Sequence, residues 1–303
     1  MSTDREAVFA ALFAGRTDAY GTENGRCARM PFDPALLARR HLDGTELVGI
    51  YPMVHLDNGW HVHWGCVDFD VQTKGKPSWD YEDEQAAHTA AVDLQTVLAS
   101  RGITSWVEQT RSHGRHVWVF ATQWIPARIM RRALLVACTV AQVSTREINP
   151  KQEDLPDTGS LGNYVRLPYA HSTDRPMLDG DTPILVDDFL SRALTGRTTF
   201  SLLNSIANLY VPPKPVTQPK PTFTPNGSSA PRELNALGRA LWQNGPFDGD
   251  RSRGMFALAG YARRSGLSPS EVYDVLKTCP WSKFQGRHDE DRRIQQIVER
   301  IWQ

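Results

Sequence analysis

The chain has 303 residues, of which 40% are hydrophobic and 22% charged, and its formal net charge at pH 7 is +0. This composition is ordinary for a soluble globular protein with one large or two modest domains. No uncharged run approaches the roughly 18 residues of a membrane span, so we expect no segment to cross a membrane. The start of the chain is not that of a secretory signal, and the four cysteines form no Cys-x-x-Cys pair. We therefore expect a cytoplasmic protein with no zinc site and no disulfide framework.

The first two thirds of the chain mix short apolar strands with amphipathic helices. Gly102 ends one predicted helix, and Pro126 lies near the start of another. Strands joined by short turns, with helices between them, indicate an α+β domain with a mixed or largely antiparallel sheet rather than a doubly wound fold. The predicted elements are, in chain order, strands 45–54 and 60–71 joined by a turn at 56–59, a helix at 78–102, strands 104–109 and 115–121 around a turn at 110–114, a helix at 125–142, and strand-like segments at 144–150 and 163–170.

A proline-rich segment follows this domain. Residues 211–231, VPPKPVTQPKPTFTPNGSSAP, contain seven prolines, two lysines and no acid. Because this segment has almost nothing to bury, we expect a semi-rigid polyproline-type linker. The chain is therefore divided into a domain at 1–210, a linker at 211–231 and a domain at 232–303.

The last domain is predicted to be a small all-α bundle. Ser268, Pro269 and Glu271 have the spacing of a helix capping box. Residues 211–303 hold 14 Lys and Arg against 9 Asp and Glu, an excess that suits nonspecific contacts with phosphates. Four arginines of this domain are spaced so that they could lie along one exposed face: Arg251, Arg253, Arg263 and Arg264. Such a face would either contact a template strand or be an ordinary solvated surface. The helices are expected at 232–243, 253–266, 268–279 and 289–302.

The strand WGCVDFDV, residues 64–71, carries two carboxylates in an otherwise apolar run. Residues two apart in a strand point to the same face, so Asp68 and Asp70 emerge side by side while Phe69 points the other way. Two neighbouring anions need a positive partner. Such a pair is a good cradle for a hard divalent cation, Mg²⁺ or Mn²⁺, although many pairs of this kind are simply solvated.

The stretch RSHGRHVWVF, residues 111–120, adds groups that bind phosphate. Ser112 supplies a hydroxyl, Gly114 lets the backbone approach closely, and His116 opens an aromatic strand. Arg111 and Arg115 add positive charge for a polyphosphate. A lone histidine in this position would more often be a satisfied core residue, but the surrounding turn favours a functional one.

A site with two metals needs a third acid. Our candidate is Glu147 in STREINPKQ, and the alternative is Asp187 in PILVDDF, which we also expect on a strand. For Asp187, a structural role at a hairpin or cap is at least as good an interpretation.

The order of these motifs resembles that of the archaeo-eukaryotic primase superfamily. DFD, then SHGRH before an aromatic strand, then NYVRLP match its three-motif pattern. LFAGRTDAYGT, HLDGTELVGIYPM and EINPKQEDLPDTGSLGNYVRLP extend the resemblance to the primase domain of TOTE conflict systems and to phage and plasmid primase-polymerases, over about residues 8–190. The last domain resembles the helical domain that follows the catalytic domain in plasmid and phage replication primases.

The resemblance implies an RRM-like sheet and a role for each matched residue. Asp68 and Asp70 would be metal ligands, and Glu147 would be the third acidic ligand. His116, with Ser112, would hold the phosphates of the incoming nucleotide, and Arg166 would face a phosphate or the template. One departure is the Ser-His-Gly-Arg-His turn, because relatives often have a longer Ser-Gly-x-Gly-x-His turn. This difference puts the contact of Ser112 in question more than that of His116.

We therefore predict a DNA-dependent primase-polymerase of phage or plasmid-type replication, which makes and extends primers by two-metal nucleotidyl transfer. The expected cofactors are Mg²⁺ or Mn²⁺, and the expected partners are a single-stranded DNA template and dNTP or NTP. A replicative helicase, fused or separate, is left open. One alternative is a primer-extending repair or end-joining polymerase of the same superfamily. Another is a non-catalytic nucleic-acid-binding protein of an origin or defence system.

Overall fold

The chain folds into two compact units in the computed structural model. The structure describes residues 5–71, 81–212, 233–246 and 250–302. The units divide at Pro212, with Met1–Pro212 in the first and Pro213–Gln303 in the second. All but the first two residues of the predicted linker at 211–231 lie outside the described residues, as do residues 78–80 of the first predicted helix.

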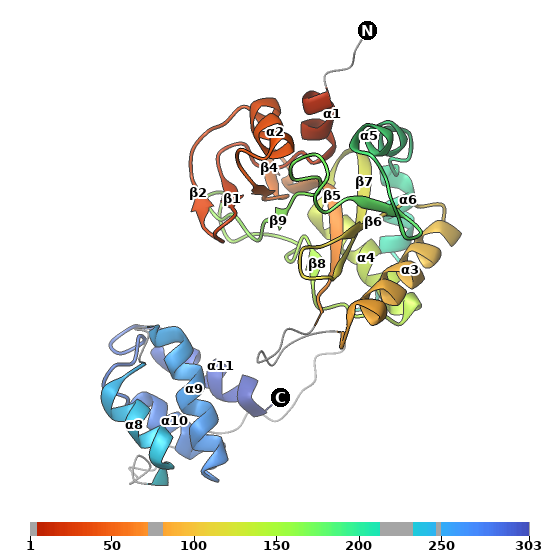
Figure 1. Cartoon of the computed structure of the whole chain (residues 1–303). Helices are drawn as coiled ribbons and strands as arrows, with labels where there is room; N and C mark the ends of the chain where they lie inside the picture. Colours follow the sequence, from red (N-terminus) through yellow and green to blue (C-terminus); the bar gives the residue numbers. More distant parts are fainter. Residues whose placement is uncertain (1–4, 72–80, 213–232, 247–249, 303) are drawn as a thin grey trace. The chain divides into compact units, whose positions relative to one another are not determined.

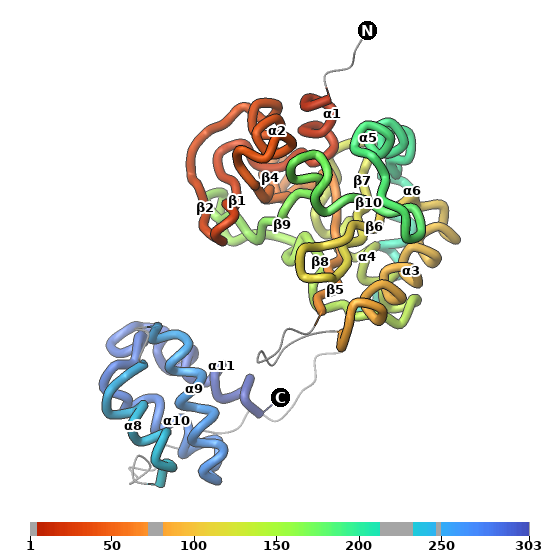
Figure 2. Tube along the Cα trace, in the orientation of Figure 1, coloured from red at the N-terminus to blue at the C-terminus, as the bar shows by residue number. Residues whose placement is uncertain are grey.

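A seven-stranded sheet runs through the first unit (Figure 1). Its path is β11-β10-β6-β7-β5-β4, and β8 pairs with β5 beside that path. Figure 2 labels these strands, apart from β11, along the chain trace. The paired strands are antiparallel, which confirms the predicted α+β fold class. The strands are β4 (Val54–Leu56), β5 (Gly59–Phe69), β6 (Trp106–Gln109), β7 (Arg115–Pro126), β8 (Ile148–Asn149), β10 (Met177–Asp179) and β11 (Thr182–Pro183).

The first unit also contains a smaller, four-stranded sheet, and the segment 45–54, predicted to be one continuous strand, is divided between the two sheets. Residues 45–54 form β3 (Val48–Ile50) in the small sheet, whereas β4 begins at Val54 in the large one. The prediction of one strand next to 60–71 is therefore wrong. Pro52 lies in the break and has no N–H to donate to a ladder. The other strands of the small sheet are β1 (Tyr20–Thr22), β2 (Cys27–Ala28) and β9 (Val165–Arg166).

Helices cover both faces of the large sheet, because its central strands bury residues on both sides. On β7, Val117 and Val119 face a core built with α3 (Glu84–Ser100), α4 (Ala127–Ala141) and α6 (Phe200–Ala207) (Figure 1). Trp118 and Phe120 alternate with them and face a second core. That second core is built with α1 (Arg5–Leu12), α2 (Pro34–Asp43) and α5 (Val186–Thr195). The strand period of two therefore decides which side chains of β5 and β7 share the second face.

The second unit is helical in its described residues, 233–246 and 250–302. Ser268 and Glu271 form the predicted capping box at the start of α10. Apolar residues such as Met255, Leu258, Ile294 and Val298 form its core. Its helices are α8 (Ala236–Asn244), α9 (Arg251–Arg264), α10 (Pro269–Lys277) and α11 (Glu290–Trp302). Across the described parts of both units, none of the helices has the length and hydropathy needed to cross a bilayer.

Candidate active site

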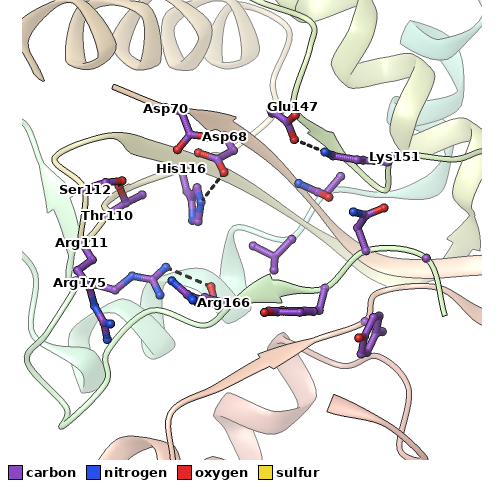
Figure 3. A pocket seen from close by; sticks show the side chains of 16 residues that line it. Asp68, Asp70, Thr110, Arg111, Ser112, His116, Glu147, Lys151, Arg166 and Arg175 are labelled. Atoms are coloured by element: carbon purple, nitrogen blue, oxygen red, sulfur yellow. Dashed lines mark hydrogen bonds and ion pairs between the residues drawn. The ribbon is translucent and has the colours of Figure 1, made fainter. Parts of the chain in front are cut away.

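A cavity of about 700 Å³ opens at the end of β5, beside β8, β9 and the turn between β6 and β7. Figure 3 shows carboxylates along one side of it and arginines along another, with His116 between them. Three residues that the sequence did not single out, Lys151, Arg175 and Tyr164, also line it. The residues singled out from the sequence that line it are Asp68, Asp70, Arg111, Ser112, His116, Glu147 and Arg166.

A row of three side chains in register crosses the sheet into this cavity. Asp68 on β5 is paired with His116 on β7, and His116 is paired with Glu108 on β6. The Oδ2 atom of Asp68 is 3.3 Å from Nε2 of His116, and Oε2 of Glu108 is 2.8 Å from Nδ1. The imidazole therefore bridges two carboxylates, one half-buried at the cavity and one buried within the sheet layer.

The two carboxylates keep His116 positively charged. Burial disfavours the charged imidazole, but the attraction of Glu108 and of Asp68 outweighs it and raises the pKa of His116 to about 10. Burial also disfavours the charge on Glu108, whereas Arg175 and His116 lower the pKa of its carboxyl. The site consequently presents a fixed cation beside Asp68, which is suited to binding an anion such as a phosphate.

The third predicted acid lies next to Asp68 along the backbone. Strand β8 pairs with β5, and the backbone N–H of Asp68 donates to the carbonyl of Glu147 at 2.9 Å. Arg131 donates to the carbonyl of Ile148 in this strand and to that of Pro150 just after it, both at 2.9 Å. The side chain of Glu147 forms an ion pair with Lys151 (Figure 3). Glu147 is thus in place beside the aspartates, and its carboxylate has a cationic partner.

The donor chemistry of these acids fits Mg²⁺ or Mn²⁺, which prefer carboxylate oxygens. Asp68, Asp70 and Glu147 all reach the same cavity. Among the residues that the structure describes, however, no group of three or more His, Cys, Asp and Glu side chains forms a ready-made metal site. The acids are therefore gathered at one cavity without being preassembled around an ion.

The turn at 110–114 was predicted to bring both Ser112 and Gly114 to a phosphate, but only Ser112 lies at the cavity. Ser112 is exposed at the cavity, with its hydroxyl 3.4 Å from that of Thr110. Gly114 does not line the cavity: a Cβ there would lie 2.5 Å from the carbonyl oxygen of Phe69. The absence of a side chain at Gly114 therefore allows contact with β5 rather than with a phosphate.

Arg115, which the sequence predicted to bind nucleotide, does not line the cavity. Neighbouring residues on a strand point to opposite faces, so Arg115 lies on the side of β7 away from His116. It is buried and pairs with Glu84 at 3.1 Å, while also donating to the carbonyls of His113 and Gly114. Through these bonds, Arg115 connects the turn at 110–114 to Glu84, the first residue of α3.

Of the two remaining candidate residues, Arg166 lies at the cavity and Asp187 does not. Arg166 on β9 is exposed at the cavity and donates to the carbonyl of Glu23 at 3.0 Å. Asp187 does not line the cavity and is exposed in the first turn of α5, so its prediction as a strand residue is wrong. An acid near a helix N-terminus is favoured by the helix dipole, which accounts for its position.

Two residues that sequence reasoning missed are Glu108 and Arg175. The only signal for Glu108 was an acid in the apolar strand Thr104–Gln109. Arg175 lies beyond the motifs, and its side chain pairs with Glu108. No local pattern identifies a contact between residues this far apart in the sequence.

Comparison with known proteins relates part of the chain to a family. Residues 29–177 match the family model described as the TOTE conflict system archaeo-eukaryotic primase domain. No curated protein matches the chain. Among solved structures, the crystal structure of primase RepB' is similar at 14% sequence identity, with a TM-score of 0.28 over 99% of this chain and 94% of that chain.

Proposed function

We propose that the first unit, in which residues 29–177 match the archaeo-eukaryotic primase domain of TOTE conflict systems, catalyses DNA-templated nucleotidyl transfer. In this proposal the protein is a primase-polymerase that starts primers on a single-stranded template and extends them with nucleoside triphosphates. The seven residues at the cavity that the sequence singled out all lie within the matched segment.

The observation that carries the proposal is the contact between Asp68 and His116 at the cavity. A carboxylate and an imidazolium 3.3 Å apart offer adjacent positions for a cation and for a phosphate. Acids and arginines line separate sides of the same cavity (Figure 3). A metal–triphosphate complex has this mixed charge, so the cavity suits it better than it suits a purely anionic or a neutral ligand.

Each residue has a proposed task in positioning and charge neutralisation. Asp68, Asp70 and Glu147 would hold Mg²⁺ or Mn²⁺. When bound, these ions would offset charge on the phosphates and on the attacking 3′-hydroxyl. His116 and Ser112 would bind phosphate oxygens of the incoming nucleotide, and Arg166 would face a phosphate or the template. The ion pair between Lys151 and Glu147 would break when the carboxylate of Glu147 binds a metal ion.

The second unit is proposed to hold the template or the initiating nucleotide. Arg251, Arg253, Arg263 and Arg264 are exposed on α9. Arg263 lies over the ring of Trp302, with 5.4 Å between the guanidinium carbon and the ring centre. Guanidinium groups beside half-buried aromatic rings such as Trp302 suit contacts with phosphates and bases of a single strand.

A primer-synthesis assay tests the proposed function. The full-length protein is incubated with a single-stranded DNA template, Mg²⁺ or Mn²⁺, and dNTPs or NTPs, without primer. We expect products longer than a dinucleotide from the wild type and none from Asp68→Asn, because amide oxygens replace a carboxylate poorly as ligands for a hard cation. Asp187→Asn, which removes an acid away from the cavity, is the matched control and should keep full activity. Full activity of folded Asp68→Asn would refute the assignment.

The same assay separates the alternatives. Extension of an annealed primer, without products from unprimed template, would favour a primer-extending repair or end-joining polymerase. No product in either format, together with no Mn²⁺ binding by calorimetry, would favour a non-catalytic nucleic-acid-binding protein.

A further inference from the structure

A buried carboxylate lies directly behind His116. Glu108 is 0% exposed and follows the buried pair Trp106 and Val107 on β6. A carboxylate removed from water in this way is tolerated only when its oxygens accept several strong hydrogen bonds. The proposed catalytic role of the cavity does not by itself require an acid at this depth.

The oxygens of Glu108 are satisfied by three donors. Its Oε2 accepts from Nδ1 of His116 at 2.8 Å and from Nε1 of Trp118 at 2.6 Å. Its Oε1 forms a charged hydrogen bond with Arg175. Arg175 lies just before β10, so the carboxylate connects β7 to a segment distant in sequence.

These bonds fix the orientation of the imidazole. Because an ionised carboxylate only accepts, the Nδ1 of His116 carries the hydrogen of their bond. With Nδ1 held by Glu108, Nε2 is directed toward Asp68 and the cavity. A ring flip would replace Nδ1 by a carbon and break the bond to Glu108, so the partner of Nδ1 determines what Nε2 can reach.

Glu108 is also linked to the opposite wall of the cavity. Arg175 donates to the backbone carbonyl of Arg166 at 3.2 Å, in addition to pairing with Glu108. Both arginines line the cavity, and Arg175 is only 7% exposed. One buried carboxylate therefore connects the imidazole with the strand that carries Arg166.

We propose that Glu108 is a positioning residue that aims Nε2 of His116 at the phosphates of the incoming nucleoside triphosphate, with Arg175 as its counter-ion. The inference rests on the proposed function and goes beyond it, because Glu108 itself touches no substrate. A purely structural ion pair would stabilise the fold without changing how one nucleotide is distinguished from another. The two interpretations therefore differ in their effect on triphosphate preference.

The test compares the binding of two nucleotides to the full-length protein by calorimetry. The probes are deoxyadenosine triphosphate and deoxyadenosine monophosphate, both with Mg²⁺. In Glu108→Gln, one amide oxygen replaces two carboxylate oxygens, so the amide N–H₂ group must face one of the three donors. We expect affinity for the triphosphate to fall by about tenfold, as for loss of one charge-assisted hydrogen bond, and affinity for the monophosphate to stay within about twofold.

A double-mutant cycle shows whether the effect passes through the imidazole. In a His116→Ala background, Glu108→Gln should cause no further loss of triphosphate affinity, because there is no ring left to position. Equal losses for both nucleotides, an unchanged affinity in the single variant, or an undiminished loss in the His116→Ala background would each overturn the inference.

A second variant covers the case in which Glu108→Gln does not fold. Glu108→Asp keeps the charge beside Arg175 but withdraws the carboxylate by one methylene from the ring, and it should show the same selective loss. The outcomes for the site as a whole are distinct. If the wild type binds no triphosphate, both the proposed function and this inference fail. If it binds and both Glu108 variants bind equally well, only this inference fails.

Discussion

Acid pH should destabilise the first unit through His41, a buried residue of α2. Its Nε2 donates to the carbonyl of Pro168 at 2.8 Å, and its Nδ1 accepts from the backbone N–H of Val48 at 3.3 Å. Both bonds suit the neutral ring, whereas a protonated Nδ1 would oppose the N–H of Val48. Burial is the main cause that lowers the pKa of His41 from 6.5 to about 4, with Arg175 and His171 contributing in the same direction.

The sign and size of the effect follow from proton linkage. The unfolded chain takes up a proton near pH 6.5, and the folded chain does so only near pH 4. The stability that His41 contributes is therefore complete above pH 6.5 and is lost as the pH falls toward 4. At about 1.4 kcal/mol per pH unit, the loss between pH 7.5 and pH 5 is about 2 kcal/mol.

Urea unfolding of the wild type and of His41→Gln, at pH 7.5 and at pH 5, measures this loss. Glutamine keeps a donor for Pro168 but does not titrate. Because the variant alters only the first unit, the difference in free energy of unfolding between the two proteins isolates the contribution of residue 41. We expect the advantage of the wild type to shrink by about 2 kcal/mol at the lower pH. The same advantage at both pH values would refute the assignment of a neutral, buried ring.

Three further predictions concern the site and the second unit. Glu147→Gln should reduce primer extension on the order of a hundredfold in gel assays if Glu147 is the third acid, while Asp187→Asn should leave the rate unchanged; the reverse result would exchange their roles. Gly114→Ala should lower the free energy of unfolding by about 1–3 kcal/mol, because its Cβ would lie 2.5 Å from the Phe69 carbonyl, and unchanged urea unfolding would contradict this. Arg253→Glu should weaken binding of single-stranded DNA and reduce its salt dependence, as measured by fluorescence anisotropy; an unaltered salt slope would argue for a plain solvated face.

Local patterns were sufficient for the elements that carry the main motifs. The apolar runs around Asp68 and His116 predicted β5 and β7, and the antiparallel sheet brings them into register. The spacing of Ser268 and Glu271 predicted the start of α10. These features depend on residues close in sequence, where strand period and helix capping act directly.

Two other features depend on tertiary contacts. A third, the direction of Arg115, follows from the alternation of side chains along a strand, which the sequence analysis did not apply to this residue. The break at Pro52 sends the two halves of 45–54 to different sheets, which no local propensity specifies. The pairing of Glu108 with Arg175 joins a strand residue to a loop residue far away in the sequence. The direction of Arg115 could have been predicted, because a strand that turns His116 into the cavity must turn its neighbour away.

The position of Asp68 on β5 has a consequence for how activity is lost. This strand pairs with β4, β7 and β8, so its amides are among those that open only when the whole unit unfolds. The turn at 110–114 is exposed at Arg111, Ser112 and His113, and this part can open locally at a much smaller free-energy cost. In amide hydrogen exchange, the amides around Asp68 should exchange slowly and those around Ser112 quickly. On heating, the turn that carries Ser112 should lose its ordered structure at a lower temperature than the strand that carries Asp68.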